Sequence, residues 1–402
     1  MNYLQKKAEY YLNELCVIIK ERSVGSEGNR QATTVFKKEM SDAGWNTESI
    51  PLDVIDWQTE GAFLSVNGEN FNVLSSPYSN GFSGNGDLVA ISTINELEKQ
   101  NIESKIVLLH KEIAKEQLIP KNFIFYNPDE HQRIIHLLEK SKASAFICAT
   151  GRNGALAGGS YPFPLIEDGD FNIPSVYMTD IEGEKLLKHV GKTIHLESLC
   201  YRIPAKAYNI TAYKNHGSSD KIVISAHIDA KKGTPGALDN AAGVVVLILL
   251  GHLLKNYSGR KSIELVAFNG EDYYAVTGQM NYIQCNRNNL DKILLNINID
   301  GAGYKEGDTA FSFYHLPGTL QNTIHEILDN SQGIKEGKPW VQGDHSIFVH
   351  YGIPALAVSS EWFTNNLETQ DITHTEKDTA DLIDCSKLVD IAVALKKIIE
   401  KL

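Results

Sequence analysis

Residues 222–243, IVISAHIDAKKGTPGALDNAAG, contain a strand, a polar loop and the start of a helix. The first five residues form a short, largely apolar run, which predicts a buried strand. His227 and Asp229 follow where this strand ends, and a loop marked by glycine and proline leads to Asp239. The next segment, VVVLILLGHLL (244–254), is apolar and long enough for a packed helix. Open α/β sheets bind ligands at the carboxyl ends of their strands, so we expect the functional site here.

The chain beyond residue 201 continues to alternate between strand and helix. We expect strands at NITAYK, KIVISAH, SIELVAFNG, ILLNINID, AFSFYH and PALAVSS. We expect helices at residues 244–255, 274–286, 317–331 and 384–402. Such alternation predicts the α/β fold class, with a mixed, mostly parallel sheet that carries helices on both faces.

The first 200 residues have a different texture. Residues 1–57 predict two helices and a strand, but they contain too little apolar material for a core of their own. From 58 to 200, short apolar segments rich in Val, Ile, Leu and Phe are separated by turns. We therefore expect one discontinuous domain made of residues 1–57 and 201–402, interrupted by a β-rich inserted domain at 58–200.

The composition excludes several classes of function. The formal net charge is −12, so a sequence-independent grip on nucleic-acid phosphates is not expected. No run of 18 apolar residues predicts a membrane span, and the N-terminus does not resemble a signal peptide. The five cysteines are scattered and form no CxxC pair, which favours reduced thiols. We predict a cytoplasmic protein without nucleic-acid or membrane partners, and the oligomeric state stays open.

Acidic residues and histidines recur in the loops that follow the predicted strands. Any one of these residues is more often solvated than ligating, and an adjacent Glu-Asp pair commonly opens a helix. The joint pattern favours a shared site, because the carboxyl ends of parallel strands meet at one edge of a sheet. The residues are Glu271, Asp272, Asp300, Asp344, His345 and His374.

These residue types suit a pair of zinc ions. Zn²⁺ takes imidazole nitrogens and carboxylate oxygens, and a catalytic site leaves one position for water. Two ions a few ångströms apart need a shared carboxylate, plus about one histidine and one further carboxylate each. Glu271 is then left beside a ligand, where it could act as general base, and Asp229 could accept the second N–H of a ligating imidazole. The residues that could supply the ligands are His227, Asp239, Asp272, Asp300 and His374, with Asp239 shared.

The loop that contains Asp344 and His345 has two interpretations. His345 could face a substrate, or it could be a packing residue. Trp340 and Trp362 could likewise line a substrate cleft or belong to the core.

Taken together, the motifs resemble those of the co-catalytic zinc aminopeptidase family, which includes aminopeptidase Y-like enzymes. They are HxD at 227–229, GALDNAAG, FNGED, NxDGAG, GDHxxF with GIP, and HTEKDTxDxID. They run in order through residues 201–402, and RSVGSEGNRQA is similar to the family's N-terminal segment. The insertion resembles a protease-associated domain in KIVLL, SAFICAT and IPSVYMTDIEGEKLL.

The resemblance implies a role for each site residue. Glu271 would take a proton from water and pass it to the leaving amine, and Asp229 would orient His227. The implied ligand pairs are His227 with Asp300 and Asp272 with His374, bridged by Asp239.

Two positions depart from the family's pattern. The second-metal carboxylate is often Glu in relatives and is Asp272 here, which still offers an oxygen ligand. Some relatives carry a tyrosine just before the last histidine to stabilise the oxyanion, whereas this chain has Thr373, so no side chain is assigned to that role. No ligand position holds a non-coordinating residue, which argues against a silent relative of the transferrin-receptor type.

The predicted function is a metallo-aminopeptidase that hydrolyses N-terminal residues from peptides. Water would be activated by two bridged Zn²⁺ ions, with Glu271 as general base, and Co²⁺ or Mn²⁺ suits the same ligands. A carboxypeptidase or other amidohydrolase is the first alternative, but a C-terminal carboxylate usually needs an arginine, and none occurs between residues 288 and 402. A non-catalytic binding protein and a glutaminyl cyclase are further alternatives. The side chain preferred at the cleaved position stays open.

Overall fold

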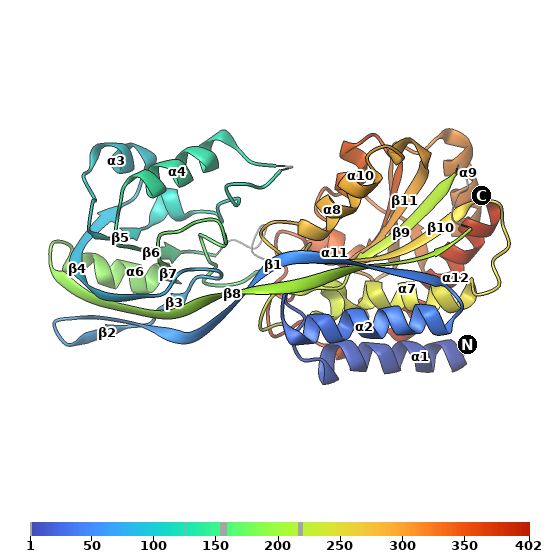
Figure 1. The fold of residues 1–402 in the computed structure, drawn as a ribbon, viewed down its shortest axis with the longest axis horizontal. Helices are drawn as coiled ribbons and strands as arrows, with labels where there is room; N and C mark the ends of the chain where they lie inside the picture. Colours follow the sequence, from blue (N-terminus) through green and yellow to red (C-terminus); the bar gives the residue numbers. More distant parts are fainter. Residues whose placement is uncertain (1, 125, 153–158, 216–219) are drawn as a thin grey trace. The chain divides into compact units, whose positions relative to one another are not determined.

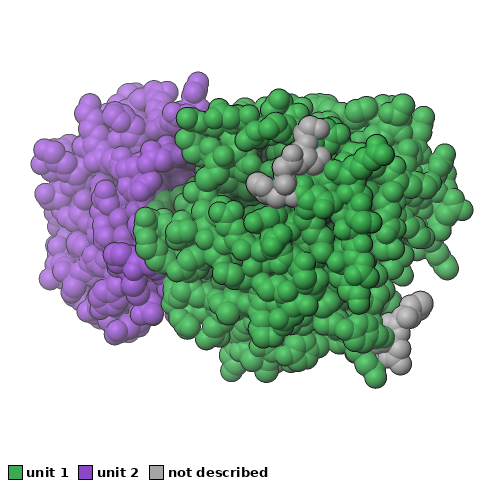
Figure 2. Space-filling view, turned by 45° about the vertical axis from the view of Figure 1, so that its right-hand side comes forward, with its two compact units in different colours: residues 1–54, 206–402 green, residues 55–205 purple. Residues whose placement is uncertain are grey.

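The computed structural model describes residues 2–124, 126–152, 159–215 and 220–402. The chain forms two compact units, residues 1–54 with 206–402 (unit 1) and residues 55–205 (unit 2), which Figure 2 colours separately. It passes between them within two long strands, β1 (Asn46–Val66) and β8 (Thr193–Lys214). The boundaries predicted from the sequence, 57/58 and 200/201, differ by three and five residues from the observed ones, 54/55 and 205/206. A strand continues through each observed boundary, so the composition does not change there.

Unit 1 is built on a mixed sheet (Figure 1). Besides parts of β1 and β8, its strands are β9 (Lys221–His227), β10 (Ser262–Phe268), β11 (Ile293–Ile299), β12 (Thr309–Tyr314), β13 (Ile334–Glu336) and β14 (Ala355–Ser360). Their order is β13-β12-β14-β11-β9-β10-β8. The central strands β14, β11, β9 and β10 are parallel, whereas β12 and β8 pair antiparallel with β14 and β10. The predicted mixed, mostly parallel α/β sheet is confirmed.

Helices cover both faces of this sheet. They are α1 (Asn2–Asn13), α2 (Glu27–Asp42), α7 (Ala242–Leu253), α8 (Thr277–Asn286), α9 (Gly318–Asp329), α10 (His345–His350), α11 (Glu361–Asn366) and α12 (Cys385–Lys401). Shorter helical turns lie at Glu14–Ile18, Ala237–Ala241, Leu290–Lys292 and Ala380–Leu382. Helix α7 lies between the sheet and α1, α2 and α12, so it is buried on all sides from Ala242 to Gly251, and this stretch is apolar throughout.

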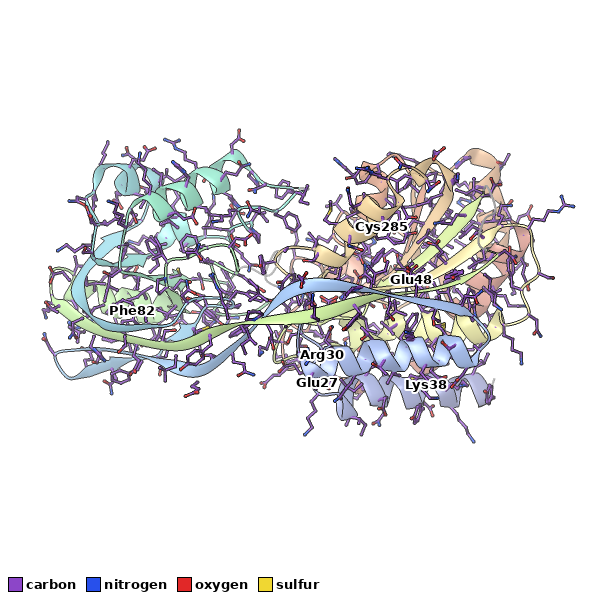
Figure 3. The ribbon with its side chains drawn as sticks, in the orientation of Figure 1. Glu27, Arg30, Lys38, Glu48, Phe82 and Cys285 are labelled. Carbon is purple, nitrogen blue, oxygen red and sulfur yellow. The ribbon has the colours of Figure 1, made fainter. Side chains whose placement is uncertain are left out.

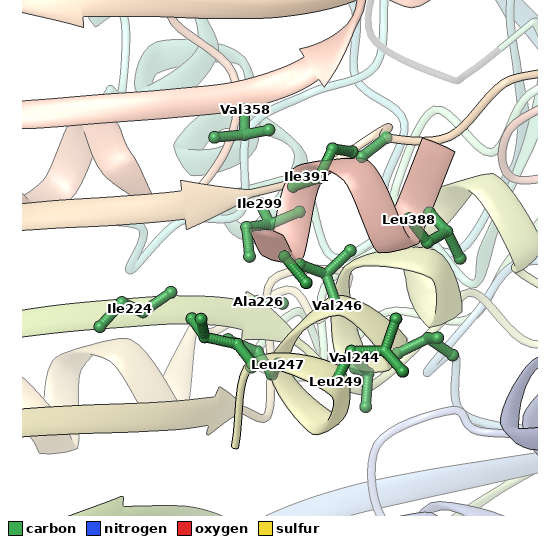
Figure 4. Close-up of a cluster of buried hydrophobic side chains, with 14 of the residues drawn as sticks. Ile224, Ala226, Val244, Val246, Leu247, Leu249, Ile299, Val358, Leu388 and Ile391 are labelled. Carbon is green, nitrogen blue, oxygen red and sulfur yellow. The ribbon is translucent and has the colours of Figure 1, made fainter. Parts of the chain in front are cut away.

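The alternation of side chains along the strands produces the two layers. On one face, Ile224 and Ala226 of β9 pack with Val246 of α7 in the main apolar core (Figure 4). On the other face, the ring of Phe268 in β10 contacts Tyr282 of α8 and Phe348 of α10. The sheet is therefore buried on both sides, and its strand ends are held rigidly.

The outward side of α2 is charged. Glu27, Arg30 and Lys38 project from this helix (Figure 3), and Glu27 pairs with Arg30 at 2.8 Å. An exposed pair of this kind contributes only about 0.5 kcal/mol. The fully buried Phe36 and Met40 on the inner side of α2 therefore do most to hold it on the core.

Unit 2 contains the remaining strands of the sheet. Besides the remainder of β1 and β8, its strands are β2 (Glu69–Phe71), β3 (Leu74–Ser75), β4 (Phe82–Ile91), β5 (Ile106–Leu109), β6 (Ala145–Thr150) and β7 (Ser175–Thr179). Its helices are α3 (Ile94–Lys99), α4 (Asp129–Lys140) and α6 (Asp180–Leu186), with 3-10 turns at Lys111–Ala114 and Leu187–His189. Strands β4 to β7 are parallel neighbours. One apolar core includes residues of α3 and α4, and a second includes Leu186 of α6.

The predicted elements differ from the observed ones mainly in length. The strand predicted at 209–214 is the end of the 22-residue β8, whose middle part has few buried residues. A strand that is exposed on both sides has no apolar alternation, so the sequence does not mark it. The short elements β13 and α11 were also not predicted, because few of their residues are apolar and buried.

The composition predicted that the chain has no membrane span and that its cysteines are reduced. Within the described ranges, no helix combines the length and the apolar character needed to cross a bilayer. The five cysteines are free: Cys285 is exposed on α8 (Figure 3), and the others, Cys16, Cys148, Cys200 and Cys385, are buried. The cytoplasmic location stays a prediction.

Candidate metal centre

The carboxyl ends of β9, β10 and β11 lie at one edge of the sheet because these strands are parallel neighbours. His227 is the last residue of β9 and is in register with Phe268, the last residue of β10. Asp300 directly follows β11, and Glu271 lies in the loop after β10. Both His227 and Asp300 are buried. The register of the sheet thus brings together residues that are 29 to 73 positions apart in the chain.

Asp239 lies between the two predicted histidine ligands. Its Oδ1 is 3.0 Å from His227 Nε2, and its Oδ2 is 3.1 Å from His374 Nε2. Each imidazole also has a second carboxylate nearby. Asp300 Oδ1 is 3.7 Å from His227 Nε2, and Asp272 Oδ1 is 2.9 Å from His374 Nε2. One carboxylate therefore contacts both imidazoles, through a different oxygen in each case.

These separations suit metal ions. The ligand atoms of His227, Asp239 and Asp300 lie within 4.8 Å of one another, as do those of Asp239, Asp272 and His374. Tetrahedral Zn²⁺ with ligands at about 2.1 Å spaces them roughly 3.4 Å apart, close to the separations of the histidine–carboxylate pairs. The buried Nε2 of His227 makes no well-formed hydrogen bond, although a carboxylate oxygen lies 3.0 Å away. Each group of three could therefore hold a cation.

The proton affinities of the site reflect its concentration of charge. Burial alone would lower the pKa of His227, but its contacts with Asp239 and Asp300 raise the pKa well above its ordinary value. Burial would also lower the pKa of His374, but the neighbouring Asp272 and Asp239 raise it well above its ordinary value. In Asp239, burial would raise the pKa, but the two imidazoles hold it below its ordinary range. In the metal-free protein, protons on the imidazoles thus balance the carboxylates.

Glu271 lies on the more accessible side of this cluster. Its Oε2 is 4.0 Å from His227 Nε2, and its side chain is 25% exposed, against 1% for His227. Burial raises the pKa of Glu271 well above its ordinary value, and the charges of Asp272 and Asp300 add to the effect while His227 opposes it. A carboxyl group with a raised pKa is suited to accept a proton and return it.

Asp229 contacts His227 differently from what the sequence suggests. His227 Nδ1 lies 3.2 Å from the backbone carbonyl oxygen of Asp229 but 3.9 Å from its Oδ1. The Asp229 carboxylate instead accepts hydrogen bonds from the backbone N–H groups of Gly270 (2.7 Å) and Asp272 (3.0 Å). The carbonyl of Asp229 therefore orients the imidazole, while its carboxylate fixes the loop that carries Glu271.

Two buried residues beside Asp239 were not among the predicted site residues. Asp378 accepts hydrogen bonds from the backbone N–H groups of Leu238 (2.7 Å) and Asp239 (3.0 Å). Burial, with a contribution from Asp239, raises the pKa of Asp378 to about 7. Arg22 donates to the carbonyl oxygens of Ile228, Pro235 and Gly236 in the same loop, and to that of Leu15 in the N-terminal segment. The sequence contained one indication of these residues: Arg22 lies in the motif RSVGSEGNRQA and Asp378 in HTEKDTxDxID, both part of the family resemblance. The resemblance assigned neither residue a role.

Of the residues with open interpretations, His345 and Trp340 are buried and Trp362 is half-buried. His345 is fully buried: its Nε2 is 3.0 Å from the carbonyl oxygen of Trp340, and its ring lies 4.6 Å from that of Tyr314. Burial lowers the pKa of His345 to about 4, so it packs as a neutral residue. Trp340 is buried beside it, and Trp362 stacks on Tyr304 with ring centroids 4.0 Å apart.

Thr373 and Asp344 are also engaged within the protein. Thr373 precedes His374, where some members of the resembling family carry a tyrosine, and its hydroxyl accepts a hydrogen bond from Gln370 at 2.6 Å. Asp344 accepts a hydrogen bond from Gln279 at 2.8 Å, and burial raises its pKa to about 7.

Fold and site together define a class of α/β proteins that carry two metal-ligand groups, joined by one carboxylate, at the carboxyl ends of a mostly parallel sheet. Residues 209–399 match the model of peptidase family M28, so this part of the chain resembles that family.

Known proteins resemble the chain in sequence and in fold. Aminopeptidase YwaD of Bacillus subtilis (strain 168) is 24% identical over 237 residues, 56% of this chain and 50% of that protein. This chain thus spans about half the length of that curated relative. An aminopeptidase from Aneurinibacillus sp. strain AM-1 superposes with a TM-score of 0.75 at 20% identity, covering 99% of this chain and 95% of that one. BSAP, a zinc aminopeptidase from Bacillus subtilis, superposes with a TM-score of 0.75 at 16% identity, covering 99% of this chain and 94% of that one. These likenesses confirm the fold.

Proposed function

We propose that the chain is a zinc aminopeptidase that removes N-terminal residues from peptides, with two Zn²⁺ ions bound per chain. The observation that carries the proposal is the position of Asp239, whose two oxygens lie 3.0 and 3.1 Å from the imidazoles of His227 and His374. The match of residues 209–399 to the model of peptidase family M28, and relatives named as aminopeptidases, support it.

The site residues divide the chemistry among them. Two zinc ions bound here would acidify a water molecule and polarise the scissile carbonyl group. Glu271 accepts the proton that the water loses and returns it to the leaving amine, consistent with its raised pKa. The Asp229 carboxylate accepts hydrogen bonds from the backbone on either side of Glu271 and so positions that residue. The ligand groups are His227 with Asp300 and Asp272 with His374, bridged by Asp239.

Arg22 bears on which end of a peptide the site binds. With Glu271 included, the groups that could hold metal contain four carboxylates and two imidazoles, so two Zn²⁺ ions would balance their negative charge, and the net charge does not distinguish an amine from a carboxylate. Arg22 lies against the loop of Asp239, but it is buried and donates to four backbone carbonyl oxygens. It is therefore engaged and does not serve as a clamp for a C-terminal carboxylate.

The test replaces the proposed base. Glu271→Gln should keep two zinc ions per chain, while hydrolysis of aminoacyl-nitroanilides falls about 10²- to 10⁴-fold because proton transfer is lost. Glu376→Gln is the matched control, since Glu376 is exposed in the loop after His374, and it should retain normal activity. Near-normal turnover in Glu271→Gln would remove Glu271 from the mechanism.

Substrate comparison separates the alternatives. An aminopeptidase cleaves peptides with a free α-amine and leaves N-acetylated peptides intact, whereas a carboxypeptidase on the same site cleaves both. A wild-type protein that binds no zinc and hydrolyses neither would instead be a binding protein. Assays with Co²⁺ and Mn²⁺ identify the metal that supports turnover. The resemblance of unit 2 to a protease-associated domain stays a prediction.

A further inference from the structure

We propose that Arg22 and Asp378 are positioning residues that hold Asp239 between the two metal positions. The proposal rests on the proposed function. Both side chains are buried, and both make their hydrogen bonds to the backbone of the loop that leads to Asp239. The guanidinium group binds the carbonyl oxygens of the loop, and the carboxylate binds its N–H groups.

Asp378 fixes the two peptide groups that lead into Asp239. Its Oδ1 accepts from Leu238 N at 2.7 Å, and its Oδ2 accepts from Asp239 N at 3.0 Å. Its own backbone carbonyl accepts a third hydrogen bond, from Ala237 N at 3.1 Å. Because consecutive N–H groups are held by the two oxygens of one carboxylate, the backbone of Asp239 has one orientation. Its side chain therefore starts from a fixed point between the imidazoles.

Arg22 ties together the two ends of the same loop. Its Nε donates to Ile228 O at 3.1 Å, directly after His227, and its two terminal nitrogens donate to Pro235 O and Gly236 O, each at 2.8 Å. A Cβ added to Gly236, which has φ +60°, would lie 2.9 Å from the guanidinium, so the loop passes close over it. Lysine lacks the planar set of five donors and cannot reproduce this pattern.

The segment that contains Asp378 also supplies a predicted metal ligand. His374 lies four residues earlier, and Asp378 N donates to Thr375 O at 3.3 Å within this segment. His374 and the bridging carboxylate are therefore held by one piece of chain. A change in Asp378 should move Asp239 relative to both imidazoles and weaken metal binding, even though Asp378 is not a ligand itself.

Zinc titration of the metal-free, full-length protein tests this inference. Asp378→Asn keeps the volume of the side chain but offers one acceptor oxygen in place of two, and Arg22→Lys keeps the charge without the fork of donors. Each variant should bind at least one of the two ions about 10- to 100-fold more weakly, with a lower kcat, as for other residues that support metal ligands. The visible spectrum of the Co²⁺-loaded protein should also change, which a general loss of stability would not cause.

Matched controls are available on the same segments. Asp371→Asn removes an exposed carboxylate that pairs with Lys377, and Arg30→Lys changes an arginine that pairs with Glu27 on the surface. Both controls should bind zinc as the wild type does. If Asp378→Asn does not fold, the titration of Arg22→Lys decides the question. Wild-type affinity and Co²⁺ spectra in the folded variants would overturn the positioning role while leaving the proposed function intact. A wild-type protein without zinc binding would instead overturn the proposed function.

Discussion

The candidate metal centre has a strand half and a loop half, and they are held in different ways. In the strand half, His227 ends β9 and Asp300 directly follows β11, so the hydrogen-bonded sheet fixes both. In the loop half, Asp272 and His374 lie in irregular segments, and the Asp229 carboxylate holds the backbone of Asp272. The side chain of His227 is 1% exposed, whereas that of His374 is 23% exposed.

This difference shows two ways of placing a ligand. A buried parallel sheet sets the position of a residue through its backbone ladder, and no further side chain is needed. A loop has no such ladder, so buried carboxylates satisfy its N–H groups and restrict it to one conformation. Asp239 joins the two halves. It lies on the segment that follows strand β9, and its backbone N–H is held by the Asp378 carboxylate, so both the sheet and a buried carboxylate position it.

The largest contrast is expected when each histidine is replaced in turn. His227→Asn should destabilise the metal-free protein by about 3–5 kcal/mol, because it leaves carboxylates buried without their imidazolium partner. His374→Asn should cost clearly less, because water reaches its partly exposed position and screens the charges left behind. Asparagine is used because its amide can still occupy the place of imidazole Nδ1. The measurement is urea unfolding of the two chelator-treated variants and the wild type.

His350 provides the control for the two histidine variants. His350→Asn, on the surface-facing end of α10, should change the free energy of unfolding by less than about 0.5 kcal/mol. Equal losses for the two site variants would show that the strand half and the loop half are equally buried in solution, and the comparison would then fail.

Prediction from the sequence was better for the strand half than for the loop half. His227 and Asp300 follow apolar runs that are unmistakable as buried strands, so their meeting follows from the parallel sheet. The contacts of the loop half depend on tertiary hydrogen bonds that no local pattern encodes. Arg22 reaches Ile228 across 206 positions, and Asp378 reaches Leu238 across 140. The carboxylate of Asp229 was assigned to the nearest histidine in sequence, but its partners lie on the loop after β10.

The length of β1 and β8 was hidden for a related reason. Periodicity reports burial, and both strands run through stretches where few side chains are buried. The sequence therefore predicted the central strands along the chain but not their order in the sheet, and it predicted only short segments of β1 and β8.

The stability of the metal-free protein should fall as pH rises above about 6.5. The folded-state pKa values of His227 and His374 are raised above the unfolded value of about 6.5, so their contribution is fully present below that pH and is lost as pH rises through the folded values. Burial raises the pKa of Glu271 and Asp300, which has the same sign. A tenfold difference in proton affinity between the folded and unfolded states corresponds to about 1.4 kcal/mol.

Calorimetry of the chelator-treated protein between pH 6 and pH 9 measures this decline. Added zinc should remove the decline, because a cation replaces the protons in both halves of the site and binds more tightly as they leave. A melting temperature that stays constant or rises over this range without metal would show that the imidazoles are not protonated in the folded protein.

The smallest effect is expected for Asp229→Asn, and it decides which half Asp229 serves. One of the two hydrogen bonds to Gly270 N and Asp272 N is lost, so the loop that carries Glu271 and the predicted ligand Asp272 loosens. The ion that Asp272 would hold should bind more weakly, and kcat should stay about 10-fold lower even at saturating zinc. Asp291→Asn, at an exposed position, is the control and should leave kcat unchanged. If Asp229 acted on His227 through its carboxylate, zinc affinity would fall first and kcat at saturating zinc would recover. The separation of 3.9 Å between Asp229 Oδ1 and His227 Nδ1 argues for the loop, so weakened zinc binding with normal kcat would assign Asp229 to the strand half instead.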